Sequence, residues 1–296
     1  MIRETTDDDL EAIAPLLRVA DDARVVSVAG LRHIRRTEPE RTRRLELVAE
    51  LDGEVVATGR AGLNTWTTTE GAAWAFVTVD PRVRRQGIGA ELGGRLIEHL
   101  EALDAKKATC LFRWTEEGER WAIDQGWSRL LTGPLIAVDP RAVAEPSLPA
   151  GYRCSSLAEL TPEDLFEAVA AAALDEPSPV PNDNFDLDEF VREWEEPDMD
   201  LESSTAVLDE GGKVVAFSFL MVGDERASHG FTGTVADHRG RGLATAAKRR
   251  ALCAAAERGV TRVTTSNAEE NAPMRAINRK LGFEQIGEHV IFGRDL

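Results

Sequence analysis

The length, composition and charge of this chain describe a soluble globular protein and argue against nucleic acid as a partner. Its 296 residues are 43% hydrophobic and 29% charged, and they suffice for two domains that each bury a core. The net charge of -17 disfavours nucleic acid, because phosphate binding needs a net basic face. An acidic surface is compatible with a cationic acceptor, but it also simply keeps a protein soluble.

The chain shows no signal for a membrane, a disulfide framework or a metal site. No apolar run approaches membrane-spanning length, and the first ten residues are acidic where a signal peptide would be basic and then apolar. Cys110, Cys154 and Cys253 lie far apart without paired spacing, which predicts buried thiols in a reducing compartment. We therefore expect a cytoplasmic protein, a monomer or homodimer, with no membrane partner.

Strands interleaved with helices are expected in the first half. Asp7–Val19 is amphipathic, with Leu10, Ile13 and Leu17 on one face, and Asp52-Gly53 is a hairpin turn signal. The expected strands are Ile2–Thr5, Leu45–Glu50, Val55–Gly62, Ala72–Val79 and Ala108–Phe112. The other expected helices are Leu31–Arg44 and Gly87–Leu103. Three tryptophans after the last strand are interpreted as core packing: Trp114, Trp121 and Trp127.

A proline-rich linker precedes a second half of the same kind. The domains are predicted as 1–140 and 151–296, joined by the linker 141–150. The expected strands are Tyr152–Ser155, Thr205–Asp209, Val214–Val222, His229–Val235, Val260–Asn267 and one or two in Glu284–Gly293. The expected helices begin at Pro162, Gly242 and Asn271, and the acidic stretch Asp175–Glu202 is expected to be a solvated loop or helix.

A glycine-rich turn between a strand and a helix is the main functional signal. In Thr234–Ala247, Gly240 and Gly242 let the backbone bend sharply and let a ligand approach closely. Unpaired amides at the helix start, the helix dipole, Arg239 and Arg241 together suit a phosphate or pyrophosphate. The alternative interpretation is a plain turn with a solvated basic rim.

The same pattern occurs twice at a fixed offset. Val77–Leu92 repeats the strand, the turn, the arginine and the glycines, and both copies fit an Arg-x-x-Gly-x-Gly/Ala frame. Gly126-Trp127 follows the first loop at nearly the distance at which Gly282-Phe283 follows the second. Capped helix starts at Thr6 and Thr161 keep the offset as well. These landmarks predict two copies of one domain.

The repeated loop, with the late Asn271, Asn278 and Leu281-Gly-Phe ending, resembles the GCN5-related N-acetyltransferases (GNAT), and the tandem layout resembles that of mycothiol synthase-like members. The resemblance implies an α/β (α+β) fold of two tandem GNAT-like domains. Each would be a mixed, mostly antiparallel sheet flanked by helices. It also implies acetyl-CoA (coenzyme A) as cofactor and no metal.

The resemblance implies two sets of cofactor-binding residues. In the second half they are Thr234, Val235, Arg239, Gly240, Arg241, Gly242, Leu243, Ala244, Thr245, Asn267 and Asn271. In the first half they are Val79, Arg84, Arg85, Gln86, Gly87, Ile88 and Gly89. The asparagines also suit capping and turn chemistry. Because the first half has Thr115 and Ala122 where the second has Asn271 and Asn278, we expect the C-terminal half to carry the chemistry.

The acid and the base of the reaction are less clear in the sequence. The family's usual tyrosine is replaced by Asn278, which could still donate a hydrogen bond to the sulfur. His229 is the preferred general base, with Asp224, Glu225, a water chain and the Leu296 carboxylate as alternatives.

The sequence thus predicts an acetyl-CoA-dependent N-acetyltransferase. It would move an acetyl group to a primary amine of an unidentified small molecule or peptide by direct attack on the thioester. The alternative is a non-catalytic acyl-CoA-binding or regulatory tandem module, and a weaker one is an O- or S-directed acyltransferase.

Overall fold

The computed structural model describes all residues, 1–296, as two compact units. The N-terminal unit comprises Met1–Gly133, Ser178–Asn184 and Gly287–Leu296, and the C-terminal unit comprises Pro134–Pro177 and Phe185–Ile286. Each unit therefore combines segments that are separate in the sequence. The domain boundaries expected from the sequence, 1–140 and 151–296, stay a prediction.

The N-terminal unit is a mixed sheet with helices on both faces. Its strands are β1 (Ile2–Glu4), β2 (Leu45–Leu51), β3 (Glu54–Leu63), β4 (Ala72–Val79), β5 (Lys107–Arg113) and β12 (Glu284–Asp295), in the order β1-β2-β3-β4-β5-β12. Its helices are α1 (Leu10–Ala20), α2 (Val28–Thr37), α3 (Ile88–Ala102) and α4 (Glu116–Asp124). The β4–β5 pair is parallel, and β1–β2, β2–β3, β3–β4 and β5–β12 are antiparallel.

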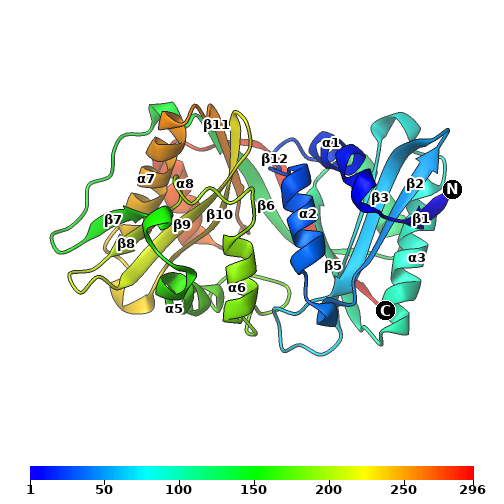
Figure 1. Ribbon diagram of the computed structural model, residues 1–296, viewed down its shortest axis with the longest axis horizontal. Coiled ribbons are helices and arrows are strands. Elements are labelled where there is room, and N and C mark those ends of the chain that lie inside the picture. The colour runs from blue at the N-terminus through cyan, green and yellow to red at the C-terminus, as the bar shows by residue number, and fades with distance from the viewer. The chain divides into compact units, whose positions relative to one another are not determined.

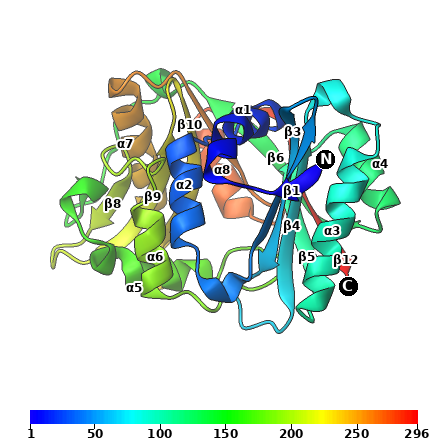
Figure 2. The ribbon, with the colours of Figure 1, turned by 45° about the vertical axis from the view of Figure 1, so that its right-hand side comes forward.

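Side-chain alternation along β3 and β4 separates the two faces of this sheet. Small residues such as Ala57 and Ala75 pack against Leu92 and Leu96 of α3. Val48 of β2 packs on the opposite face against Leu10, Ile13 and Leu17 of α1. Figure 2 shows α3 on one side of these strands and α1 and α2 on the other.

The last strand of the chain completes the N-terminal unit. His289–Asp295 of β12 pairs antiparallel with Lys107–Arg113 of β5. Phe292 is fully buried and stacks on Phe112, with ring centroids 5.2 Å apart. Figure 1 accordingly shows the C-terminus beside β5 and α3. A second segment of the later chain joins this unit as well, because Asp183 accepts a hydrogen bond of 2.7 Å from the Thr68 N–H.

The C-terminal unit repeats this architecture. Its strands are β6 (Ser128–Val138, from Pro134 onward), β7 (Arg153–Ser156), β8 (Thr205–Leu208), β9 (Val214–Val222), β10 (Arg226–Thr234) and β11 (Arg262–Ser266), in the order β6-β11-β10-β9-β8-β7. Its helices are α5 (Pro162–Ala173), α6 (Leu187–Trp194), α7 (Leu243–Glu257) and α8 (Ala272–Lys280). Ala206 and Leu208 pack with α5, whereas the intervening Val207 packs with α7, so these helices cover opposite faces (Figure 1).

The predicted fold class is confirmed, and the local errors have clear causes. β4 covers Ala72–Val79 as predicted, and Asp52 and Gly53 both have positive φ angles, as a tight hairpin turn requires. The helix expected over Leu31–Arg44 ends at Thr37, because Pro39 disfavours helical geometry at Glu38. Helix α4 and strand β6 had no prediction.

A lysine lies inside the core of the C-terminal unit. Lys248 of α7 is 1% exposed, and its Nζ lies 5.4 Å from the centroid of the Phe283 ring. Burial lowers the pKa of this amine to about 7, because a charged ammonium is poorly solvated there. The stability of the unit should therefore depend on pH.

We predict that Phe292→Ala destabilises the N-terminal unit although the residue lies close to the C-terminus. Removal of a fully buried phenylalanine typically costs about 3–5 kcal/mol. Hydrogen exchange should accelerate in α3 and β5 and stay unchanged in α7. The control is Leu111→Ala on β5, whose side chain is 48% exposed. Faster exchange in α7 instead of α3 would contradict the assignment of β12 to the N-terminal unit.

We predict that Lys248 makes the protein more stable as the pH rises above about 7. Its folded pKa lies below the ordinary lysine value of 10.5, which applies to the unfolded chain, so the unfolded chain binds more protons between these two values. The slope contributed by one such group is at most about 1.4 kcal/mol per pH unit. Lys248→Met should raise Tm at pH 7 and flatten its rise toward pH 10, whereas Lys213→Met, at an exposed position, should not. An unchanged pH profile in Lys248→Met would refute the prediction.

Candidate active site

Strands β4 and β5 separate shortly after they begin to pair. Their parallel register covers only Ala72–Trp74 of β4 against Lys107–Thr109 of β5. β4 nevertheless continues to Val79 and stays paired with β3 along its other edge. The main chain of β4 beyond Trp74 therefore borders a gap in the sheet.

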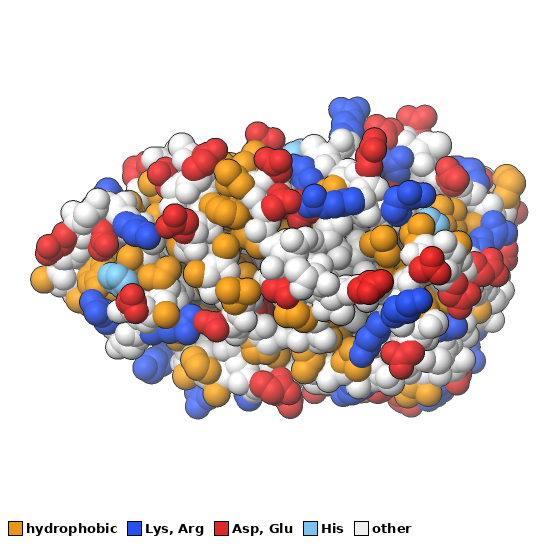
Figure 3. Space-filling view, turned by 90° about the horizontal axis from the view of Figure 1, so that it is seen from below, with side chains coloured by type: hydrophobic (Ala, Val, Ile, Leu, Met, Phe, Trp, Pro, Cys, Tyr) orange, Lys and Arg blue, Asp and Glu red, His pale blue; other side chains and the backbone are white.

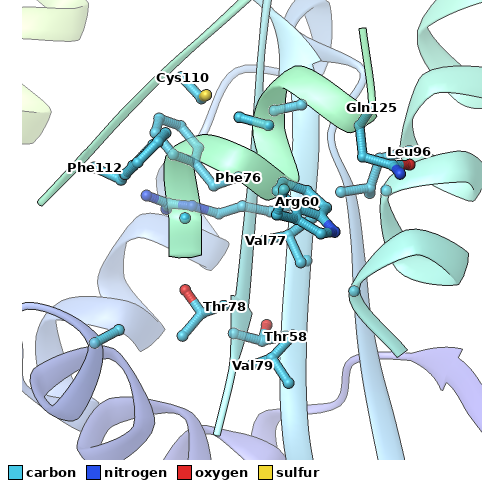
Figure 4. A pocket seen from close by; sticks show the side chains of 18 of the residues that line it. Thr58, Arg60, Phe76, Val77, Thr78, Val79, Leu96, Cys110, Phe112 and Gln125 are labelled. Carbon is cyan, nitrogen blue, oxygen red and sulfur yellow. The ribbon is translucent and has the colours of Figure 1, made fainter. Parts of the chain in front are cut away.

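A cavity of about 430 Å³ occupies this gap and reaches both faces of the sheet. Residues on the α3 face line it, among them Ala75, Val77 and Leu96. Residues on the α1 face line it too, and Figure 4 shows them around the same space together with Cys110 and Phe112 of β5: Thr58, Arg60, Phe76 and Thr78. A ligand on one face can therefore meet a ligand on the other.

The first glycine loop forms one end of this cavity. Arg84 donates from Nε to the Val79 carbonyl at 3.2 Å and fixes the turn after β4. Arg85 and Gly87 have φ angles of 66° and 85°, and a Cβ atom at Gly87 would meet nothing within 4 Å. The N–H groups of Arg85, Gln86 and Gly87 donate no hydrogen bond within the protein. The loop thus presents free amides at the N-terminus of a 15-residue helix, α3.

The predicted residues of this half lie together, with one exception. The exposed Gln86 does not line the cavity. The others do, and they are Val79, Arg84, Arg85, Gly87, Ile88 and Gly89. Trp121 and Trp127 also line the cavity, so two of the three tryptophans interpreted as core packing border the ligand space. Trp127 is buried in the core, and Trp114 is 36% exposed.

The second glycine loop has the same construction in the C-terminal unit. Arg239 donates from Nε to the Thr234 carbonyl at 3.1 Å, and Gly240 and Gly242 have φ angles of 75° and 80° with open space at their Cβ positions. The N–H groups of Gly240, Arg241 and Gly242 donate no hydrogen bond within the protein. α7 begins at the next residue, and its first turn includes the predicted Leu243, Ala244 and Thr245.

The two arginines of the second loop have protein partners. Arg239 forms an ion pair with Asp175. Arg241 donates to the Tyr152 hydroxyl at 2.6 Å and to the Asp237 carbonyl at 3.2 Å. In the first loop, Arg84 pairs with Glu117 at 3.3 Å. The pyrophosphate of coenzyme A fits both loops, because each offers free amides, a helix N-terminus and glycines without Cβ atoms.

The base and the acid predicted for the C-terminal half, His229 and Asn278, are both buried and both lie next to Phe283. β10 pairs with β11 only over Arg226–Ser228, so His229 lies where these strands separate. Its Nδ1 lies 3.2 Å from the Phe219 carbonyl oxygen and its Nε2 has no partner. Burial and the charge of Lys248 lower the pKa of His229 well below 6.5.

The asparagines of the C-terminal half fix its local structure. Asn278 donates to Asn267 Oδ1 at 2.6 Å, while its own Oδ1 is buried without a partner. The Asn271 side chain accepts from the Met274 N–H at 3.2 Å and so caps α8. Asn278 lies beside Phe283, whose N–H donates to the Asn278 carbonyl, and the His229 ring centroid is 6.3 Å from that of Phe283. The two buried atoms without partners, His229 Nε2 and Asn278 Oδ1, thus belong to residues that both neighbour Phe283.

Aromatic side chains fill the α5 face of the C-terminal unit. Phe217 contacts Phe219 and Phe231, with ring centroids 5.1 Å and 5.3 Å apart. A Cβ atom on Gly233 would lie 2.6 Å from Phe217, so no space remains there. On the corresponding face of the N-terminal unit, residues such as Thr58 and Arg60 line the cavity instead.

Sequence reasoning missed three residues near this cavity. Arg60 lies in β3 between Gly59 and Ala61, and a charged residue inside an apolar strand was the available signal. Asp21 lines the cavity and lies 3.0 Å from Nε2 of His289. Burial alone would raise the pKa of Asp21, but its hydrogen bond with His289 and the charge of that ring lower it. No local pattern connects residues this far apart in the sequence.

In Figure 3, acidic and basic side chains are interspersed over the face shown. None of the helices is long and apolar enough to cross a bilayer. All three cysteines are free, although only Cys253 is fully buried.

Comparisons with known proteins agree with this architecture. Solved structures with the same fold include a GCN5-related N-acetyltransferase from Sphaerobacter thermophilus, with a TM-score of 0.71, 19% identity and coverage of 100% of this chain and 95% of that one. They also include a tandem GNAT protein from the clavulanic acid biosynthesis pathway, with a TM-score of 0.76, 22% identity and coverage of 100% and 98%.

The sequence comparisons identify the family. Two proteins named mycothiol acetyltransferase are similar to the chain. The one from Clavibacter michiganensis is 26% identical over 76% of this chain and 73% of the relative, and the one from Amycolatopsis mediterranei is 28% identical over 84% and 83%. The model of the acetyltransferase (GNAT) family matches residues 14–124 and 167–283. The chain therefore belongs to the GNAT family, as a tandem member, and is an acetyltransferase.

Proposed function

We propose that the protein transfers the acetyl group of acetyl-CoA to a primary amine, and that this transfer takes place in the cavity of the N-terminal unit. The observation that supports this placement is the cavity itself, which connects the first glycine loop with the opposite face of the sheet. The cofactor and the acceptor can then approach the gap between β4 and β5 from different sides. The amine carried by the acceptor would attack the thioester directly.

The cofactor site follows from the free backbone groups. The pyrophosphate would bind the amides of Arg85, Gln86 and Gly87 at the start of α3. The pantetheine arm would run along the free edge of β4 as an added strand does, because β5 leaves that edge beyond Trp74. A main-chain N–H of β4 would then stabilise the oxyanion that develops on the thioester.

The proton of the acceptor needs a base, because an alkylammonium has a pKa of about 10. We assign this role to Asp21, which lines the cavity and which His289, against the effect of burial, keeps as a carboxylate able to accept the proton. The neutral amine forms the new C–N bond, the C–S bond breaks, and the thiolate of coenzyme A takes up a proton. A thiol with a pKa of about 8.5 leaves without a dedicated acid, so a tyrosine is not required.

The C-terminal unit is proposed as a second cofactor site. Its loop, Arg239–Thr245, has the same free amides and open glycine positions as the first. Catalysis there by His229 and Asn278 stays a prediction. Both side chains are buried, and an aromatic cluster fills the α5 face. The names of the two relatives give a substrate for those proteins only. For this chain the proposal names the acceptor class alone, a primary amine.

We predict that Gly87→Glu and Gly242→Glu each remove one of two acetyl-CoA sites. The new carboxylate would enter the anion site of its loop and weaken binding there at least about tenfold. Isothermal titration calorimetry should give two sites for the wild type and one for each variant. The matched controls are Gly53→Glu and Gly259→Glu, which have similar positive φ angles and open Cβ positions in turns away from the loops. Unchanged affinity and stoichiometry in both loop variants would contradict the cofactor assignment.

We predict that turnover follows the N-terminal site. With a panel of primary amines, Asp21→Asn should lower kcat at least about a hundredfold, since general base catalysis typically contributes that much. Its acetyl-CoA affinity should be unchanged. His229→Gln is the comparison variant at the base predicted from the sequence. A loss of turnover in His229→Gln with a normal rate in Asp21→Asn would move the chemistry to the C-terminal unit.

A further inference from the structure

An arginine in the sheet of the N-terminal unit faces the cavity without a polar partner. Arg60 lies opposite Phe76 in the β3–β4 register, so both side chains are on the face that carries α1 and α2. Its side chain lines the cavity and makes neither an ion pair nor a hydrogen bond. Its guanidinium carbon lies 5.0 Å from the Phe76 ring centroid and 5.7 Å from that of Trp74. Figure 4 shows Arg60 beside Phe76.

The aromatic contacts use none of the N–H donors of the guanidinium in a hydrogen bond. An arginine stacked on a ring keeps its N–H donors in the plane of the group, where they can bind an acceptor atom. Arg60 is surrounded by protein atoms, and burial together with the charges of Arg24 and Arg44 lowers its pKa to about 9. The group is therefore still a cation at neutral pH. A cation held in this way is stabilised by an anion from outside the protein.

Three charged residues that line this part of the cavity, Glu46, Asp21 and Arg113, already have partners. Glu46 forms ion pairs with Arg35 and Arg44. Asp21 pairs with His289, and Arg113 pairs with Asp22. Because these charges are matched within the protein, they leave Arg60 available for an external anion. A planar guanidinium without an ion pair matches a planar carboxylate in shape.

We infer that the acceptor carries a carboxylate, which binds the guanidinium of Arg60 while its amine faces the gap between β4 and β5. The inference rests on the proposed transfer in the N-terminal unit and names its substrate class, a compound of the amino acid type. A planar guanidinium binds a carboxylate through two parallel hydrogen bonds, and this fixes the orientation of the bound molecule. Polyamines and other amines without an acidic group would lack this contact.

The C-terminal unit offers no equivalent contact on its own face. There the side chains of Phe217, Phe219 and Phe231 pack against one another where the N-terminal unit has Arg60 and open space. The inferred recognition therefore belongs to the N-terminal unit alone. This difference allows the acceptor class to be tested separately from cofactor binding.

The experiment compares acceptors that differ only by a carboxylate. The pairs are β-alanine and ethylamine, lysine and cadaverine, and phenylalanine and phenethylamine, followed by the other standard amino acids. In any pair that the wild type acetylates, kcat/KM should be at least about tenfold higher for the member that carries the carboxylate. Arg60→Gln should abolish this preference, mainly through KM, and Arg60→Lys should restore part of it. Arg120→Gln, at an exposed arginine of α4, is the matched control and should keep the preference.

Three results would overturn the inference. Equal turnover of both members of every pair, unaffected by Arg60→Gln, would exclude carboxylate recognition and leave the transfer in place. A preference for O-phosphoethanolamine over β-alanine would replace the carboxylate by a phosphate. If no amine turns over, the proposed transfer itself fails. Amino acid binding is then measured by thermal shift in the presence of coenzyme A. The inference is refuted if no amino acid raises Tm in a way that Arg60→Gln abolishes.

Discussion

The early separation of β4 from β5 is the constraint on which the site depends. Three residue pairs hold these parallel strands together, and beyond them each strand is held by its other neighbour. β3 pairs with β4 as far as Val79, and β12 pairs with β5 as far as Arg113. The edges of β4 and β5 that face the gap are therefore unpaired beyond Trp74 and Thr109. The glycine loop, the cavity and the aromatic support of Arg60 all lie along this gap.

Both units contain a pair of parallel strands that separate early, and they differ in the side chains that occupy the space around the separation. In the C-terminal unit β10 also leaves β11 after three pairs, but Lys248, Phe283 and the Phe217 cluster occupy the space around that separation. In the N-terminal unit a cavity of about 430 Å³ remains along the gap. Both loops retain the features needed for a pyrophosphate. The two units differ in the space next to the loop, where an acceptor would bind. We therefore propose the transfer for the N-terminal unit and only cofactor binding for the C-terminal unit.

The sequence was sufficient for features that depend on neighbours along the chain. The paired glycine loops, the Asp52-Gly53 turn and the bounds of β4 follow from local backbone chemistry. The placement of β12 in the N-terminal unit could not be predicted, because strand pairing between distant segments leaves no local pattern. The contact of Asp21 with His289 was hidden for the same reason. Arg60 was visible as a charge within an apolar strand, but its stacking on Trp74 and Phe76 needed the register of β3 with β4.

The most direct measurement is a crystal structure with a bisubstrate compound in which the sulfur of coenzyme A is joined through an acetyl bridge to the nitrogen of β-alanine. We expect the pyrophosphate at Arg85–Ile88, the bridge between β4 and β5, and the carboxylate on the guanidinium of Arg60. A compound bound with its β-alanine part between β10 and β11, near His229, would contradict the placement of the transfer in the N-terminal unit.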